Sequence, residues 1–219
     1  MEYRKVEELY NELTALCPVY QPGLGDATEI ITNNGGHYLD RRTIRGVRNA
    51  LARQFALDQQ AAREIYGELV GRRALVPLPL SIHLILIPVK LRRPVTANDS
   101  AYGYVAVNQV SGLVTSPVYP RGCRLQLLNG YCLDSPSSRE TVSRTLGDGR
   151  LIAQRYCDYI GAHRAKLTSG RAGEESGVLS NEGLGIAEAV VELAKQVNLL
   201  VDVLTGVIQG LKKDRLPRR

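Results

Sequence analysis

Arginine side chains between residues 41 and 73 are the groups of this chain best suited to binding chemistry. The segment holds eight arginines against three carboxylates, a net charge of +5. A planar guanidinium matches phosphate and the edge of guanine better than an ammonium does. The cluster therefore favours contact with a polyanion such as nucleic acid, and the alternative is a solvated basic surface with no ligand. The eight residues are Arg41, Arg42, Arg45, Arg48, Arg53, Arg63, Arg72 and Arg73.

Two helices are expected to position these arginines. Apolar residues at helical spacing predict a first helix that begins near residue 40, with Asp40 as its N-cap. Asp58 is expected to cap a second helix, which ends at Gly71. The first helix then presents an arginine stripe beside its apolar stripe.

The helix pair resembles a helix-turn-helix, with Ala56 where that motif usually has glycine. In that arrangement Ala62 and Ile65 would be buried, and the polar start of the second helix would face base edges. A further basic group ends the apolar segment that follows. The residues predicted to contact DNA are Arg41, Arg45, Arg48, Gln59, Gln60, Arg63, Lys90, Arg92 and Arg93.

Patterns after residue 74 predict a small β-meander. Residues 81–91 are apolar and bounded by prolines, and residues 101–110 alternate with the period of a strand. Asn129-Gly130 predicts a two-residue hairpin turn within residues 123–135. Ser137, followed three residues later by a glutamate, predicts a capping box that starts a helix closing the meander.

The expected fold class is α+β: a small antiparallel β-meander domain with an N-terminal helical hairpin and a long C-terminal helix. Apolar spacing over residues 3–16 predicts an additional short helix, and a strand is expected at Glu29–Thr32. Residues 151–163 are also expected to be helical. The first domain is predicted to span residues 1–163.

The C-terminal part of the chain carries an apolar heptad pattern. Residues 164–183 are rich in Gly, Ser and Glu, which is typical of a linker, and the region 184–219 is predicted to hold an oligomerisation helix with a basic tail. The alternative is a core helix packed on its own domain. The heptad seam consists of Val190, Ala194, Val197, Val201, Leu204, Ile208 and Leu211.

Three segments together resemble the competence transcription factor (ComK) family of Gram-positive bacteria. They read GRRALVPLPLSIHLILIPVKLRRP, GYVAVNQV and RLQLLNGYCLDSPSSRETVSRTL. The matching features are the strand Leu84–Pro88, Gly103-Tyr104, the hairpin from Leu127 to Gly130, and Ser138 at a helix start. The hairpin and helix are also similar to the DNA-binding domain of LytTR response regulators. The resemblance implies a cytoplasmic DNA-binding regulator that acts as an oligomer on AT-rich sites.

An enzyme is not expected. The sequence contains no Gly-rich phosphate loop, no GxSxG and no HExxH. His83 lies in an apolar segment and is expected to be a core residue. The cysteines have no CxxC pair, so no metal site and no cofactor are predicted. They are Cys17, Cys123, Cys132 and Cys157.

Two functional classes are therefore in competition. The charge of +6, with pI about 9.2, favours a DNA-binding transcription regulator whose partners are double-stranded DNA and further copies of itself. The alternative is a non-enzymatic assembly or adaptor protein that works through the heptad helix. No signal peptide, membrane span or small-molecule effector is indicated, so a cytoplasmic location is expected.

Overall fold

Two antiparallel β-sheets and four α-helices make up the part of the chain that the computed structural model describes, which is residues 1–96 and 99–171, with side chains as far as residue 161. The larger sheet has seven strands in the order β1-β4-β3-β2-β7-β6-β5, and only the β1–β4 pair is parallel. Its strands are β1 (Glu2–Tyr3), β2 (Leu13–Gln21), β3 (Gly25–Thr32), β4 (His37–Asp40), β5 (Leu78–Ser81), β6 (Leu84–Lys90) and β7 (Tyr102–Ala106).

The smaller sheet has the order β10-β9-β8, with β8 at Val110–Thr115, β9 at Cys123–Leu127 and β10 at Cys132–Ser135. The α-helices are α1 (Val6–Leu9), α2 (Ile44–Gln54), α3 (Gln59–Leu69) and α4 (Arg139–Arg171). Two 3-10 turns, η1 (Tyr10–Glu12) and η2 (Val107–Gln109), precede β2 and β8. The α+β class expected from the sequence is confirmed. The helical hairpin is not N-terminal, however, because β1 to β4 precede it and supply four of the seven strands of the large sheet.

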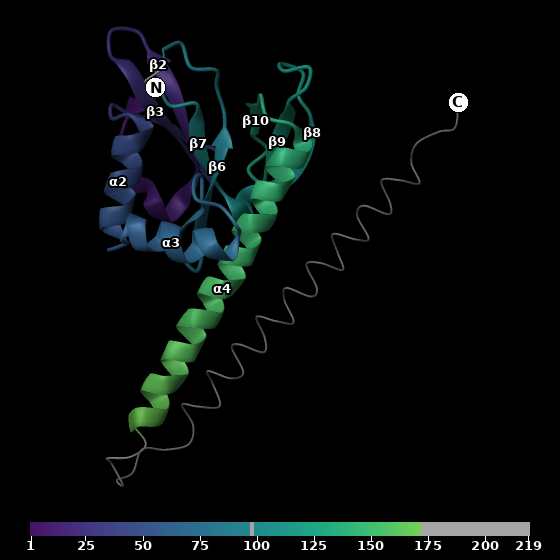
Figure 1. The fold of residues 1–219 in the computed structure, drawn as a ribbon. Helices are drawn as coiled ribbons and strands as arrows, with labels where there is room; N and C mark the ends of the chain where they lie inside the picture. Colours follow the sequence, from purple (N-terminus) through teal and green to yellow (C-terminus); the bar gives the residue numbers. More distant parts are fainter. Residues whose placement is uncertain (97–98, 172–219) are drawn as a thin grey trace. The chain divides into compact units, whose positions relative to one another are not determined.

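The large sheet separates two apolar cores (Figure 1). On one face, Ile44, Val47 and Leu51 of α2 pack against Leu16 and Ile30 of the sheet. The opposite face is covered by the small sheet and by the first half of α4, whose side chains join one continuous buried cluster. All of this belongs to one compact unit, Met1–Lys166. The sheet thus holds α2 on the side away from α4.

The helix predicted for residues 3–16 is wrong in its second half, because Leu13 and Leu16 belong to β2. Val6 and Leu9 are in α1 and η1 separates them from the strand, yet all four side chains are buried in the same core. The apolar residues have helical spacing in the sequence, but the structure places them in a short helix and in a strand that both pack into the same core.

The two middle helices are confirmed, with one cap misplaced. Asp58 caps α3, since its Oδ1 accepts the N–H groups of Gln60 (2.8 Å) and Ala61 (3.1 Å). Thr43, not Asp40, caps α2 by accepting the N–H of Gly46 at 3.4 Å. Asp40 does not cap α2 because its carboxylate binds the Arg42 side chain and the N–H groups of Val6 and Arg42.

A hairpin is confirmed at Asn129-Gly130, but its loop is not the two-residue turn that was expected. Gly130 has φ of +83°, whereas Asn129 is not in the positive-φ region that a two-residue turn requires. The N–H of Gly130 donates to the carbonyl of Leu127, so the loop comprises residues 128–130. The strand β8, which pairs with β9, was not expected from the sequence. Ser138 rather than Ser137 caps α4, because its Oγ accepts the N–H of Thr141 at 3.3 Å.

Helix α4 is continuous where the sequence predicted a break and then a linker, and it runs on to Arg171. A Cβ on Gly149 would lie 2.5 Å from Ile87 and 2.6 Å from Val107, so glycine lets the helix approach the sheet closely. Asp148, between the two glycines, forms a 2.8 Å ion pair with Arg72. The Gly-Asp-Gly sequence is therefore a packing feature of the helix, not its end.

Candidate nucleic-acid interface

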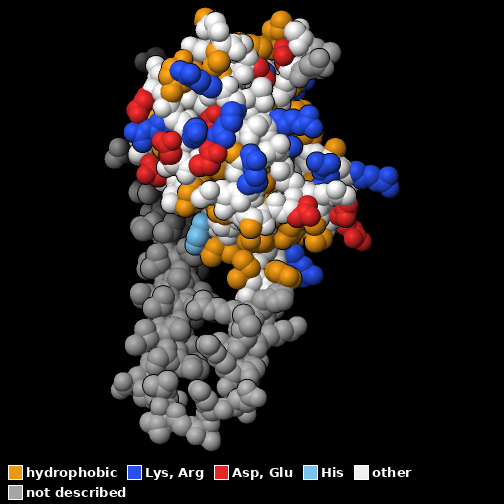
Figure 2. Space-filling model, turned by 90° about the vertical axis from the view of Figure 1, so that its left-hand side faces the viewer, with side chains coloured by type: hydrophobic (Ala, Val, Ile, Leu, Met, Phe, Trp, Pro, Cys, Tyr) orange, Lys and Arg blue, Asp and Glu red, His pale blue; other side chains and the backbone are white. Residues whose placement is uncertain are grey.

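Helix α2 carries three arginines and no acidic residue. Arg45 and Arg53 are exposed at positions i and i+8, with the half-buried Asn49 between them, so they follow one side of the helix. Arg41, also exposed, immediately precedes the helix. Seen from the α2 side, basic side chains gather over the upper and middle part of the molecule with acidic ones among them (Figure 2). The stripe predicted from Arg41 through Arg45 is therefore on the surface.

The predicted third member of the stripe, Arg48, turns toward the sheet instead. It is half-buried, and its Nη1 donates to the hydroxyl of Tyr104 on β7 at 3.2 Å. Its Nε is buried and has no hydrogen-bond partner within the described part of the chain. Arg53, rather than Arg48, is the third exposed arginine on this side of the protein. Arg53 is not among the DNA contacts predicted from the sequence.

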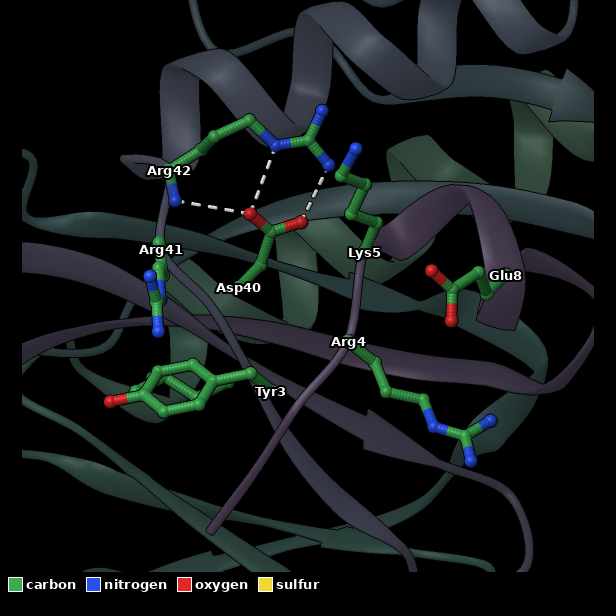
Figure 3. Close-up of a pocket in the computed structure, with 8 residues that line it drawn as sticks. Tyr3, Arg4, Lys5, Glu8, Asp40, Arg41 and Arg42 are labelled. Atoms are coloured by element: carbon green, nitrogen blue, oxygen red, sulfur yellow. Dashed lines mark hydrogen bonds and ion pairs between the residues drawn. The ribbon is translucent and has the colours of Figure 1, made fainter.

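A pocket of about 330 Å³ extends this basic surface beyond the start of α2. Tyr3 and Arg41 form one side of it, with the guanidinium carbon 4.4 Å from the ring centroid, and Glu8 lies on the other side (Figure 3). Arg4 and Lys5 follow β1 and run between them. The parallel pairing of β1 with β4, in which Tyr3 is opposite Leu39, brings this N-terminal segment alongside the segment that leads into α2.

The charge of Arg4 is only weakly bound within the protein. Its Nε donates to Glu2 at 2.8 Å, and both side chains are substantially exposed. An exposed pair of this kind contributes little and exchanges readily for a phosphate. We call the exposed cations around the pocket and along α2 the α2 basic face; it consists of Arg4, Lys5, Arg41, Arg45 and Arg53.

Arg42 is excluded from that face by its own ion pairs. Its two Nη atoms donate to Glu7 at 2.8 and 2.6 Å, and it also binds Asp40, which is 3% exposed. The hydrogen bonds from Arg42 lower the pKa of the Glu7 carboxyl to about 2. The same two Asp40 oxygens also accept the backbone N–H groups of Val6 and Arg42. This arginine joins α1, β4 and the start of α2.

Arg92, predicted to contact DNA, also makes its contacts within the protein. It forms a 2.6 Å ion pair with Asp26 and lies 4.1 Å from the ring centroid of Tyr20. Its Nε donates to the carbonyl of Ser100. These contacts hold the loop after β6 against the β2–β3 hairpin.

The two basic neighbours of Arg92 also lie apart from the α2 stripe. Lys90, half-buried, ends β6 opposite Tyr102. Arg93 is exposed, 5.6 Å from the ring centroid of Tyr119, and lines a separate small pocket with Arg121. The structure therefore does not join Lys90, Arg92 and Arg93 to the α2 basic face.

Helix α3 is a poorer surface for DNA than the helix-turn-helix interpretation predicts. Its exposed residues include Glu64 and Glu68 beside Arg63, and carboxylates repel phosphate. Ile65, expected to be buried, is 64% exposed, since α3 packs through Ala62 and Gly67.

The predicted glutamines of α3 make contacts within the protein. Gln59 donates to Asn49 on α2 at 3.1 Å, and Gln60 donates to Glu64 at 3.2 Å. The first contact ties the two helices together. The second joins two residues one turn apart on the surface of α3. Both amides are therefore already hydrogen-bonded within the protein and are not free to bind base edges in a DNA groove.

Other reactive side chains do not form a further centre in the described residues, where no group of His, Cys, Asp and Glu could hold a metal ion. Burial raises the pKa of the Cys17 and Cys123 thiols, which disfavours the reactive thiolate. The Nδ1 atom of His37 lies 2.9 Å from Glu29, and the His37 ring meets the ring of Tyr131 edge-on. His83 is exposed in the β5–β6 turn, so its expected place in the core is wrong.

Comparisons with protein-family models, curated proteins and solved structures found no match to this chain. The ComK-like and LytTR-like resemblances stay predictions. The heptad seam from Val190 to Leu211 lies outside the described residues. Among the helices described, none has the length and apolar character needed to cross a membrane.

Proposed function

We propose that the protein is a DNA-binding regulator that holds duplex DNA through the α2 basic face. The observation that carries the proposal is the arrangement of exposed cations from the N-terminal segment and from α2, a helix that contains three arginines and no carboxylate. Arginine-rich surfaces of this kind bind the phosphate backbone and release its counterions. In this proposal the phosphate contacts lie on α2 and the N-terminal segment, and α3 holds α2 in position through the Gln59–Asn49 hydrogen bond.

Two features of the face support a duplex as the ligand. Arg45 and Arg53 are two helical turns apart, about 12 Å at 1.5 Å per residue, so they span a row of phosphates rather than a single anion. The pocket beside Arg41 adds a concave end in which Lys5 and the Arg41–Tyr3 stack can hold a further phosphate. Base edges are not needed for this mode, so it predicts salt-dependent affinity with modest sequence preference.

Salt dependence measures how many of these cations contact phosphate. If four or five members of the face are engaged, log K should fall with log salt at a slope of about −3.6 to −4.5. Fluorescence anisotropy of a labelled duplex over a salt series gives the slope. A slope flatter than about −1 contradicts the proposal.

A charge-matched comparison locates the interface. The double variant Arg41→Ala/Arg45→Ala should weaken duplex binding by about tenfold or more and flatten the salt slope by about 2. The control is Arg144→Ala/Arg150→Ala, which removes two exposed arginines from α4 and makes the same change in net charge. Equal losses in both variants would mean that net charge, and not the α2 basic face, determines binding.

We further propose that the protein acts in the cytoplasm, without enzymatic activity and without a cofactor. All four cysteines are free thiols, which suits a reducing compartment. Mass analysis of protein isolated without reductant tests this point, because disulfide-linked forms would contradict it.

A further inference from the structure

The strand β8 is an edge of the small sheet, and beyond the bulge between Val110 and Gly112 its regular segment, residues 112–115, has no protection against pairing. It lies at the end of the order β10-β9-β8, and β9 is its only strand partner in the described part of the chain. Its sequence, Val-Ser-Gly-Leu-Val-Thr, contains neither a charge nor a proline. Edge strands in monomeric proteins are normally guarded by one of these, because unpaired N–H and C=O groups recruit another strand.

The other three sheet edges of the described structure are guarded. β5 contains Pro79, and the other edge of the large sheet, β1, is only two residues long and includes Glu2. β10 carries Asp134, paired with Arg124, and its Ser135 hydroxyl donates to the Lys90 carbonyl of the large sheet. Among the strands that the structure describes, residues 112–115 of β8 are thus the unprotected stretch of sheet edge.

The hydrogen-bond pattern identifies which groups of β8 face outward. The N–H of Ser116 donates to the carbonyl of Gly122, and Val114 and Gly112 are paired with β9 at the same alternation. In an antiparallel pair, alternate residues direct their backbone groups to opposite sides. Leu113 and Thr115 therefore present their N–H and C=O groups to the free edge.

We propose that β8 pairs antiparallel with β8 of a second copy of this chain, centred on Leu113, to form one continuous six-stranded sheet. An antiparallel arrangement about a two-fold axis satisfies both edges with the same segment, as an isologous interface requires. Leu113 then faces its own counterpart, and Thr115 lies at the end of the regular paired stretch, opposite the bulge at Ser111 of the other copy.

Charge favours a second copy over an unrelated peptide. No Lys, Arg, Asp or Glu occurs from residue 100 to residue 120, so two copies bring no like charges together along the paired segment. Val114, within this strand, is 38% exposed, and a neighbouring strand would reduce its exposure. The inference does not depend on nucleic-acid binding.

Amide hydrogen exchange of the full-length wild-type chain tests the pairing without a variant. The amides of Leu113 and Thr115 should exchange slowly, and their protection should fall on dilution as the dimer dissociates. Rapid exchange at every concentration overturns the proposal. Protection that is independent of concentration also overturns it, because the edge would then be covered by its own chain.

A matched pair of substitutions isolates the backbone contact. Thr115→Pro removes the outward N–H but none that β8 donates to β9, and proline is tolerated at such an edge position. Thr115→Val keeps the N–H and the branched shape. Sedimentation over a dilution series should show a dimer dissociation constant raised at least about tenfold by Thr115→Pro and unchanged by Thr115→Val.

Exchange at Leu113 separates this contact from any other self-association of the chain. In Thr115→Pro the Leu113 amide should exchange rapidly at concentrations where it is protected in wild type and in Thr115→Val. Equal Leu113 protection in all three proteins overturns the proposal. A circular-dichroism melt of each variant verifies that the fold is retained.

Discussion

Arg42 and Glu7 form a paired ion bridge in which two parallel hydrogen bonds, of 2.8 and 2.6 Å, join the first turn of α1 to the segment that enters α2. The same guanidinium binds the buried Asp40. Within a run of consecutive arginines, one side chain therefore holds the fold together while its neighbour Arg41 remains exposed to solvent. Arg42 therefore stabilises the fold, whereas Arg41 is available for the proposed contact with DNA.

The first prediction separates these roles. Arg42→Ala should lower the free energy of unfolding by about 2–3 kcal/mol, because it leaves the buried Asp40 carboxylate without its cationic partner. Arg45→Ala should change the free energy of unfolding by no more than about 0.5 kcal/mol, since that side chain is exposed. Urea denaturation followed by circular dichroism measures both. Similar losses in the two variants would contradict the assignment.

The second prediction concerns acid stability. The hydrogen bonds from Arg42 lower the pKa of Glu7 from 4.5 to about 2. A carboxyl with a lowered pKa in the folded state stabilises the protein above its unfolded pKa, and that contribution is lost as pH falls toward the folded pKa. The free energy of unfolding should therefore decline from pH 4.5 to pH 2. Asp134, whose pKa is also lowered by its hydrogen bond from Arg124, adds to the same decline.

Glu7→Gln provides the control for that pH dependence. The variant should be less stable than wild type near neutral pH, and its free energy of unfolding should vary less between pH 4.5 and 2. Denaturant unfolding at a series of pH values gives both curves. Parallel curves for wild type and variant would show that Glu7 does not contribute.

The third prediction uses two glycines of α4. Gly149→Ala should destabilise the protein by about 1–3 kcal/mol, because the new methyl group would overlap Ile87 and Val107. Gly147→Ala meets nothing within 4 Å and should stabilise the helix by up to about 1 kcal/mol. Thermal unfolding of the two variants measures the difference. If both substitutions stabilise the protein, α4 does not pack closely on the sheet.

The fourth prediction decides which helix faces DNA. Arg63→Ala on α3 should weaken duplex binding less than Arg45→Ala on α2, because Arg63 is flanked by Glu64 and Glu68. Anisotropy titrations at one fixed salt concentration compare the two variants directly. A larger loss for Arg63→Ala, confined to a preferred DNA sequence, would restore the helix-turn-helix interpretation with α3 as the reading helix.

Several elements of the fold were predictable because their signals are local. The Asn129-Gly130 turn needs only a residue that adopts positive φ, and Gly130 supplies it. The α2–α3 pair was recognisable from its apolar stripe and from the Asp58 cap, whose hydrogen bonds reach only two and three residues along the chain. The apolar strand β6 was evident from composition alone.

Tertiary structure decided the features that depend on residues far apart in sequence. Leu13 and Leu16 lie in a strand because β3 and β7 pair with that segment, and apolar spacing could not distinguish this from a helix. The sequence alone placed Arg41, Arg45 and Arg92 in one candidate site. Only the fold brings Asp26 to Arg92 and Glu7 to Arg42. The carboxylate neutralises the charge of its arginine and occupies its N–H donors, so that the arginine attracts a further anionic ligand only weakly.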